Sequence, residues 1–412
     1  MTNLNSTRGL NTLLVCGVLL ATASAAMAQT GDWVPVTGEE TLRDFMSGLH
    51  VERELPGKAM SQGEYNTDGT GVLHSWGARF PRTWTVKNDD QLCVTEERVT
   101  QCYRIEESTL EPGLFRARNV SSDQLTEFRL VENEAIAVGK PKEVGSKGGP
   151  AAASAAEIAA ELSNPNTAMG TLNTNFDFIA FDGDLPGAGD ESALKMVFQP
   201  SLPYPLGGGT NFFVRPAIPI IFDQSVPNLD GGFDSKGLDL GDIGFDASFG
   251  FSFKNGTNTN VVIAGMAGTI PTATDDSLGL DQWLLGPELG GFLVRKWGVV
   301  GIIASHQWDI AGEDSFSTST TGGQYIYVLN LKDGWQITGS PAWSYNHKAE
   351  SGNAWTFPLA AGIAKTVFWA GRPWKLSAQY WHYIESPAAF GPKNQVRVTI
   401  GPVVSLPWKG RQ

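Results

Sequence analysis

The sequence predicts an all-β chain in which an antiparallel transmembrane β-barrel of about twelve strands follows a small α+β domain of one helix and a β-meander. Three observations predict it. Residues 243–253 alternate apolar with small or polar residues, and a strand places these two sets on opposite faces. Such segments recur to the end of the chain with alternately long and short connections. Trp and Tyr gather at both ends of the segments, as at the two boundaries of a membrane.

Residues 1–28 have the pattern of an export signal. Arg8 supplies the positive end, residues 13–21 the short apolar run, and residues 26–28 an A-x-A cleavage site. The mature chain is therefore expected to start at Gln29. Cys16 lies inside the apolar run without small residues before it, so a lipoprotein anchor is not expected there.

Composition limits the class of protein. A chain of 412 residues is long for one core and suggests two domains. Its 48 Gly, 13 Trp and 18% charged residues suit an aromatic-rich β protein, and a net charge of −13 argues against nucleic acid as a partner. Beyond the signal there is no apolar run of the ~18 residues that a membrane helix needs.

Residues 29–138 form the expected first domain, which the predicted topology places in the periplasm. The segment 37–40 has the T-x-x-E form of a capping box, and Leu42, Phe45 and Met46 follow at helical spacing. From residue 63 onward, short strand-like runs alternate with turns. Cys93 and Cys102 are an even pair in an oxidising compartment, so a disulfide between neighbouring strands is expected.

This domain lacks the residue patterns of an active site. His50 and His74 have no companions at metal-ligand spacing. We therefore expect no catalytic residue, no metal site and no cofactor, and a binding role stays open.

Residues 139–166 form the expected linker. A Gly- and Lys-rich run is followed by an Ala-rich stretch that predicts a short helix ending at residues 163–165. Residues 167–412 form the expected outer-membrane barrel.

The barrel strands are expected near the length that crosses a tilted bilayer path, ~9 to 11 residues. They cover residues 171–181, 193–203, 210–222, 242–253, 260–271, 282–294, 299–309, 324–331, 335–346, 354–368, 374–383 and 395–406.

Aromatic residues support this order of strands, because amphipathic rings prefer the two water–lipid boundaries. One set lies at the short turns or chain end: Trp297, Trp335, Trp369, Trp374 and Trp408. The other set flanks the long connections: Trp283, Trp308, Tyr325, Tyr345, Trp355 and Tyr383. A soluble β domain remains an alternative, since each strand's alternation is a weak signal.

Strand alternation also selects the residues expected to face the lumen, because a charge facing lipid at mid-membrane costs ~2 to 4 kcal/mol. These candidates are Lys195, Gln199, Arg215, Asp242, Asp246, Glu288, Lys375, Gln379 and Arg397. They line a solute path, or they pair with one another as an interior packing network.

Three phrases carry a family resemblance: L-S-N-P at 162–165, M-V-F-Q-P-S-L-P-Y-P-L at 196–206 and V-R-P-A-I-P-I-I-F at 214–222. They resemble a family of bacterial outer-membrane barrels described as transporter-like. It is related to barrels named for the MetA pathway of phenol degradation and often mislabelled neuromedin U. The resemblance implies an outer-membrane location and uptake of small hydrophobic or aromatic molecules.

The last strand resembles the closing strand that the barrel-assembly machinery recognises, which usually ends in an aromatic residue. Here Trp408 is followed by residues 409–412. Outer-membrane lipid, lipopolysaccharide and that machinery are thus the expected partners, with a small-molecule solute.

Two other classes of function stay open. The barrel is a structural anchor or adhesion protein that carries the first domain, or it is a lipid hydrolase. A barrel hydrolase needs a Ser activated by a nearby His. His306 follows Ser305, which points to the opposite face of the strand, and no His has Ser two residues later. We therefore expect no enzyme.

Overall fold

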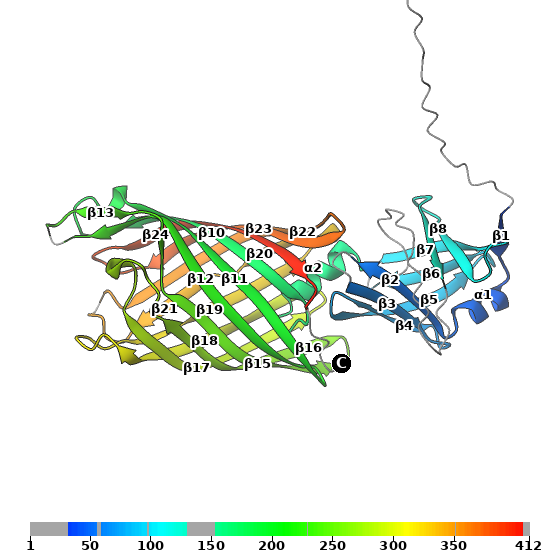
Figure 1. Ribbon diagram of the computed structural model, residues 1–412, viewed down its shortest axis with the longest axis horizontal. Helices are drawn as coiled ribbons and strands as arrows, with labels where there is room; N and C mark the ends of the chain where they lie inside the picture. The colour runs from blue at the N-terminus through cyan, green and yellow to red at the C-terminus, as the bar shows by residue number, and fades with distance from the viewer. Residues whose placement is uncertain are drawn as a thin grey trace, which may run out of the picture.

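The computed structural model describes residues 32–55, 59–96, 99–129, 153–228, 230–350 and 352–406. The predicted signal peptide with Cys16, residues 130–152 of the predicted domain end and linker, and Trp408 lie outside the described residues. The described chain forms a small β domain followed by a large closed barrel (Figure 1). Neither α-helix in the described part is long and apolar enough to cross a bilayer.

The N-terminal domain is an antiparallel sheet with one helix. Its sheet order is β2-β3-β4-β5-β6-β7-β8-β9, and β1 pairs with β7. The elements are β1 (Trp33–Val36), α1 (Glu39–Met46), β2 (Leu49–Leu55), β3 (Ala59–Tyr65), β4 (Thr70–Ser75), β5 (Ala78–Lys87), β6 (Gln91–Glu96), β7 (Val99–Ser108), β8 (Leu114–Asn119) and β9 (Leu125–Arg129).

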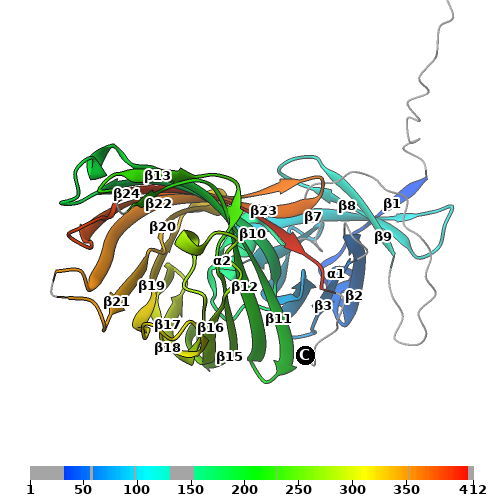
Figure 2. The same cartoon turned by 60° about the vertical axis from the view of Figure 1, so that its left-hand side comes forward.

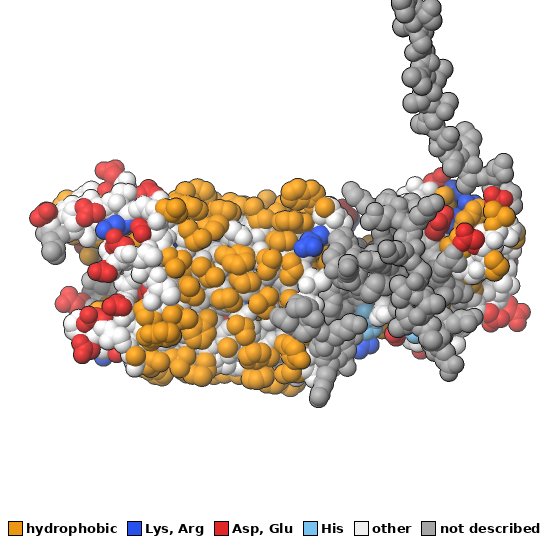
Figure 3. All heavy atoms as spheres, viewed as in Figure 1, with side chains coloured by type: hydrophobic (Ala, Val, Ile, Leu, Met, Phe, Trp, Pro, Cys, Tyr) orange, Lys and Arg blue, Asp and Glu red, His pale blue; other side chains and the backbone are white. Residues whose placement is uncertain are grey.

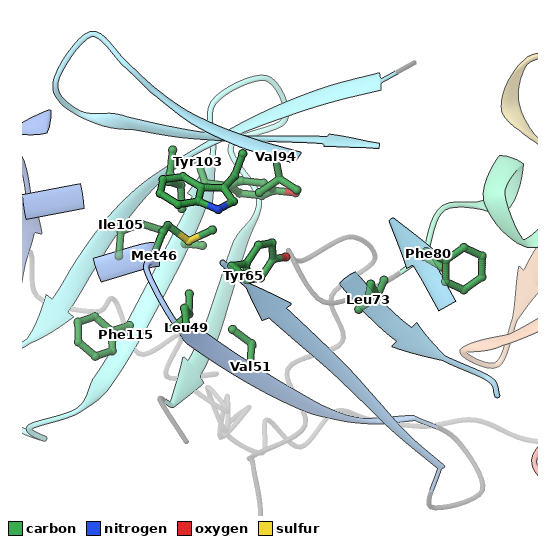
Figure 4. Packing of buried hydrophobic residues seen from close by; sticks show 14 of the residues in the cluster. Met46, Leu49, Val51, Tyr65, Leu73, Phe80, Val94, Tyr103, Ile105 and Phe115 are labelled. Atoms are coloured by element: carbon green, nitrogen blue, oxygen red, sulfur yellow. The ribbon is translucent and has the colours of Figure 1, made fainter. Parts of the chain in front are cut away.

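The core of this domain lies between α1 and the sheet. Leu42 and Met46 are four residues apart, so they share one helix face, and both are buried. They join Tyr103, Ile105 and other side chains of the sheet's inner face (Figure 4). Burial of this apolar surface is the main free-energy gain that holds the domain together.

Two local predictions have different outcomes. The predicted T-x-x-E capping box is wrong, because Gly38 is the N-cap of α1 and no side chain caps it. Cys93 on β6 and Cys102 on β7 are direct cross-strand partners, and a disulfide joins them.

The second part is a closed antiparallel barrel of twelve strands, as the sequence predicts (Figures 1 and 2). One of the twelve is interrupted and counts as two elements, β20 and β21. The strands are β10 (Gly170–Asp182), β11 (Ser192–Gly207), β12 (Thr210–Pro227), β15 (Ile243–Asn255), β16 (Asn258–Ile270), β17 (Gln282–Arg295), β18 (Gly298–Gly312), β19 (Ser319–Asn330), β20 (Trp335–Gly339) with β21 (Ala342–Asn346), β22 (Trp355–Trp369), β23 (Arg372–Glu385) and β24 (Gly391–Val404).

Pairing of the first strand with the last closes the barrel. β10 hydrogen-bonds to β11 on one side and to β24 on the other. Two short strands, β13 (Phe233–Lys236) and β14 (Asp239–Leu240), pair with β12 beyond the wall. The predicted strand 335–346 is broken between β20 and β21, where Pro341 lacks the N–H that a ladder requires.

The two rims of the barrel differ. The short-turn rim has connections at 208–209, 256–257, 296–297, 331–334 and 370–371. The long-loop rim has connections at 183–191, 228–242, 271–281, 313–318, 347–354 and 386–390. The N-terminal domain lies at the short-turn rim, and acidic side chains gather at the long-loop rim (Figures 1 and 3).

Apolar side chains cover the outer wall between the rims (Figure 3). On β15, Phe249 and Phe253 are exposed, whereas Ser248, directly before Phe249, is buried in the interior. On β17, Leu289 is 66% exposed while its neighbour Glu288 is buried. Exposure therefore follows the two-residue period of a strand, with the apolar side out.

The predicted aromatic belts are visible at both rims. Trp297, Trp335 and Trp369 are exposed at the short-turn rim, and Trp283, Trp308 and Trp355 toward the long-loop rim. Tyr383 corrects the sequence assignment. Its hydroxyl donates to Gln395 Oε1 at 2.7 Å, and Gln395 is buried inside the barrel. Tyr383 is thus an interior residue, because it shares the strand face of Trp381 and Gln379.

Leu289 tests the outward face. Replacing Leu289 with Arg puts a charge near the middle of the outer wall, so the free energy of unfolding should fall by about 2 to 4 kcal/mol. Reversible urea unfolding in lipid vesicles measures this change. Leu238→Arg, at an exposed loop position beyond the wall, is the matched control and should change little. Equal effects of the two substitutions would contradict a lipid-facing wall.

The disulfide gives a second prediction. Changing both Cys93 and Cys102 to Ser opens a loop of sequence separation 9, which should lower the stability of the N-terminal domain by about 2 to 3 kcal/mol. Near-UV circular dichroism of the detergent-solubilised protein in urea follows this transition while the barrel stays folded. An unchanged midpoint would show that the bond contributes nothing.

Candidate functional site in the barrel interior

The barrel interior contains polar and charged side chains from strands all around the wall. The fully or nearly buried ones are Asn175, Asp177, Ser248, Gln282, Glu288, Gln336, Thr338, Thr366, Gln379 and Gln395. Alternation aims them inward, opposite to the exposed apolar residues on the same strands. Buried polar groups need partners, and most of these side chains find them on other strands, on the loops or on the helix before the first strand.

The first interior cluster surrounds Asp177, which is fully buried. Arg397 donates to both carboxylate oxygens, Nε to Oδ1 at 2.6 Å and Nη2 to Oδ2 at 2.8 Å. Gln395 Nε2 donates to Oδ1 at 2.8 Å. The Arg397 guanidinium lies 4.4 Å from the centroid of the Trp381 ring. Such a bidentate pair fixes the orientation of the arginine on the wall.

Lys195 adds a second cation to this cluster. It is the direct cross-strand partner of Asp177 on β11. With Asp177, Arg397 and Lys195 the cluster has two formal positive charges and one negative charge. This part of the wall therefore has a net positive charge beside aromatic ring surface.

The second cluster surrounds Arg215 on β12. Its Nε donates to Asp246 Oδ2 at 2.8 Å, and its Nη2 lies 3.9 Å from Glu288 Oε1. Ser248 Oγ donates to Glu288 Oε1 at 2.8 Å. Here two carboxylates face one guanidinium, so the formal charge of the cluster is negative.

The remaining sequence candidates lie apart from these clusters. Gln199 is the cross-strand partner of Asn173. Gln379 accepts from Ser340 N at 3.0 Å and from Trp381 Nε1 at 3.1 Å. Lys375 Nζ is 3.4 Å from Ser163 Oγ. Asp242 precedes β15 and accepts from the amides of Thr272, Ala273 and Leu280, so it holds a long loop together.

Sequence reasoning missed Asp177 and Trp381. The signal for Asp177 was present, because Phe176 and Phe178 flank it and an outward pair of phenylalanines turns the residue between them inward. Trp381 gave no such signal, since an indole suits either face near a rim.

A segment before the first strand crosses the short-turn end of the barrel. We call residues 153–169 the crossing segment; it contains α2 (Ala155–Ser163), which Ser154 and Glu157 cap reciprocally. α2 packs against β18, β19, β20, β22 and β23. Gln336 Nε2 on β20 donates to Ala159 O at 3.0 Å and to Ser163 Oγ at 2.9 Å. One side of the barrel thus holds the helix.

The other end of the crossing segment binds the opposite wall. Asn166 Nδ2 donates to Gly209 O at 2.8 Å and to Ser252 Oγ at 2.7 Å, and Asn211 Nδ2 on β12 donates to Asn166 O at 2.8 Å. From β12 to β20 the sheet order runs β15-β16-β17-β18-β19 one way and β11-β10-β24-β23-β22 the other. Five strands separate the anchors in both directions, so the segment spans the mouth along a diameter.

The N-terminal domain holds the same segment from outside the barrel. Arg82 on β5 has a fully buried side chain and forms an ion pair with Glu157 of α2, with Nη2 3.0 Å from Oε2. Glu96 on β6 is the cross-strand partner of Arg82, and Glu96 Oε1 lies 3.8 Å from Nη2. We call Arg82, Glu96 and Glu157 the latch. Ile158 and Met169 of the crossing segment extend the apolar core of the domain.

Two glycines allow these close approaches. A Cβ on Gly334 of the 331–334 turn would lie 3.0 Å from Ala155 O, and a Cβ on Gly77 between β4 and β5 would lie 2.9 Å from Ala168 O. Both glycines have positive φ, a conformation that other residues adopt at a cost. The barrel turn and the domain turn are thus both shaped to meet the crossing segment.

Burial of the latch changes the protonation of Glu96. Removal from water, and then the nearby Glu157 carboxylate, raises the pKa of Glu96 to about 8. The single buried guanidinium of Arg82 compensates the charge of only one carboxylate, so the protonated form of Glu96 is favoured.

The residues of the hydrolase alternative lie on the outer wall. His306 Nδ1 is 2.7 Å from Thr321 Oγ1, and Nε2 is 3.3 Å from Ser319 Oγ. Thr321 Oγ1 is 2.8 Å from His347 Nε2. Ser305 lies on the inward face of β18, so it is not the partner of His306. Among the hydrogen bonds of the described residues, no carboxylate orients either histidine.

The acidic loops are held by local contacts. Lys236 Nζ donates to Asp275 Oδ2 at 2.9 Å, and Lys393 forms an ion pair with Asp182. Within the described ranges, no three His, Cys, Asp or Glu side chains are grouped as metal ligands.

The fold and interior define a membrane-spanning β-barrel of the outer-membrane type, with an apolar outer wall, aromatic rims and a charged interior. No family model and no curated protein matches the chain.

Two solved structures that match part of the chain are an outer membrane channel from Pseudomonas putida F1 and CdiB from Acinetobacter baumannii. The first has 12% identity and a TM-score of 0.45, and the match covers 57% of this chain and 95% of that one. The second has 6% identity and a TM-score of 0.27, and the match covers 86% of this chain and 59% of that one.

Proposed function

We propose that this protein is an outer-membrane channel for small solutes, related to the transporter-like barrels that its sequence resembles. Charged clusters on the interior wall carry the proposal, because charged side chains that line a pore are what select the solutes of a channel. Outer-membrane barrels have their short turns in the periplasm and their long loops outside. The N-terminal domain is then periplasmic, and the acidic loops meet lipopolysaccharide.

The interior favours small aromatic solutes that carry an acidic group. Arg397 and Lys195 supply positive charge, and the half-buried Tyr383 supplies ring surface beside them, while the buried Trp381 packs against the Arg397 guanidinium. A fully apolar solute would have to displace water from these charges without replacing their contacts. An aromatic carboxylate satisfies both features, which refines the expectation of hydrophobic or aromatic uptake.

Ion selectivity tests the channel. Asp177→Asn removes the only formal negative charge of the first cluster, so the reversal potential in a KCl gradient should shift toward that of chloride. The reversal potential is measured in planar bilayers for the wild type and for Asp177→Asn. Glu157→Gln is measured as well, because this substitution weakens the latch. Asp223→Asn, at an exposed residue of β12 beyond the ion pairs, is the control and should leave selectivity unchanged.

The absence of conductance in planar bilayers would contradict the channel. If all of these variants insert, as heat-modifiable migration in gels would show, and none gives reproducible conductance steps, the structural anchor becomes the better description. Liposome swelling with benzoate against benzyl alcohol tests the solute class, and faster entry of the alcohol would contradict the preference for acids.

The hydrolase alternative has one supporting contact, between Ser319 and His306. A Ser–His pair without an orienting carboxylate or amide is an incomplete catalytic group. We expect no release of fatty acid from phospholipid by the purified protein. Hydrolysis that is lost in both Ser319→Ala and His306→Ala would instead establish the enzyme.

A further inference from the structure

The crossing segment is held from two sides that belong to different parts of the chain. The barrel holds the C-terminal end of α2 through Gln336, and holds the residues after it through Asn166. The N-terminal domain holds the first turn of α2 through Arg82 and Glu157. Detaching the domain therefore removes the ion pair from the first turn of α2 and leaves that turn held by packing against the barrel.

The charged side chains of the latch are largely buried, and their formal charges do not balance. Arg82 is fully buried and Glu157 is nearly so. One guanidinium faces two carboxylates, and Arg82 Nε and Glu96 Oε2 have no hydrogen-bond partner among the described residues. An ion pair of this kind binds strongly only if the nearby charges balance. The balance holds when one carboxyl group is protonated.

The other titratable groups around the latch are tyrosines. Tyr65 on β3 and Tyr103 on β7 interact electrostatically with Glu96. Burial raises the pKa of Tyr65 to about 12 and that of Tyr103 further. Both tyrosines therefore stay neutral between pH 6 and pH 9, whereas the pKa of Glu96 lies inside this range.

We propose that the N-terminal domain and the crossing segment form a gate over the short-turn end of the barrel, and that loss of the Glu96 proton unlatches it. The gate regulates the channel proposed above, so its effect on solute passage rests on that function. The undocking of the domain does not. Acid conditions keep the gate docked, and alkaline conditions release it.

The direction follows from proton linkage. The docked pKa of Glu96 is about 8, against an ordinary value of 4.5. The docked state therefore binds more protons than an undocked state in which Glu96 meets water. Docking is strongest at low pH, weakens as the pH rises above the ordinary value, by up to tenfold per pH unit, and levels off above pH 8.

Double electron–electron resonance, which measures the distance between two spin labels, tests docking directly. Spin labels at Lys87→Cys on the domain and Lys296→Cys on a short turn report the separation of the two parts. Both residues are exposed, and the native disulfide leaves Cys93 and Cys102 unlabelled. For the full mature chain in lipid nanodiscs we expect one narrow distance at pH 6 and a broad distribution at pH 9.

Substitutions test whether the protonation of Glu96 controls docking. Glu96→Gln imitates the protonated acid, so the distance should stay narrow at both pH values. Glu157→Gln removes the carboxylate that Arg82 holds, so the distance should be broad at both. Glu64→Gln, at an exposed position of the same domain, should behave as wild type. Near-UV circular dichroism confirms that each variant is folded.

The outcomes separate the gate from the channel. An unchanged wild-type distance between pH 6 and pH 9, or a Glu96→Gln variant that broadens like wild type, overturns the gate. Bilayer conductance on the same samples should rise with pH in wild type and stay low in Glu96→Gln. If the distances broaden as expected while no sample conducts, the channel proposal fails and the docking switch stands.

Discussion

Backbone hydrogen bonding in hydrocarbon is the constraint on which the structure depends. No water is available there to satisfy N–H and C=O groups, so a sheet in a membrane has to close on itself. Pairing of β10 with β24 removes the two edges that an open sheet would leave. Closure then separates every strand into an outward and an inward face, and this separation decides which residues meet lipid and which line the interior.

The interior shows how such a barrel keeps charges stable. Asp177 with Arg397, and Asp246 with Arg215, are cross-strand partners, so the register that closes the sheet also brings opposite charges together. Each pair offsets part of the cost of removing an ion from bulk water. What the pairs leave over, a cation at Lys195 and a carboxylate at Glu288, gives the wall local charge for a solute to meet.

The architecture was predictable because alternation and turn length are local properties. Residues 243–253 reveal their two faces without any partner, and short turns such as 296–297 are readable from Gly and charged residues. The crossing segment was not predictable in the same way. Its Ala-rich stretch predicts a helix, but the contacts of Glu157 with Arg82 and of Asn166 with Ser252 join residues 75 and 86 positions apart. Such pairings depend on the assembled barrel, and no pattern near either residue specifies them.

The function of this fold requires that the exposed apolar side of each barrel strand touches hydrocarbon. Spin labels placed one at a time along β17, from Leu284 to Leu293, test it by their relative accessibility to oxygen, which concentrates in lipid, and to a water-soluble nickel chelate. We expect a two-residue period in vesicles, with Leu285, Leu289 and Leu293 most accessible to oxygen. Accessibility without that period, or highest oxygen exposure at Glu288, would contradict it.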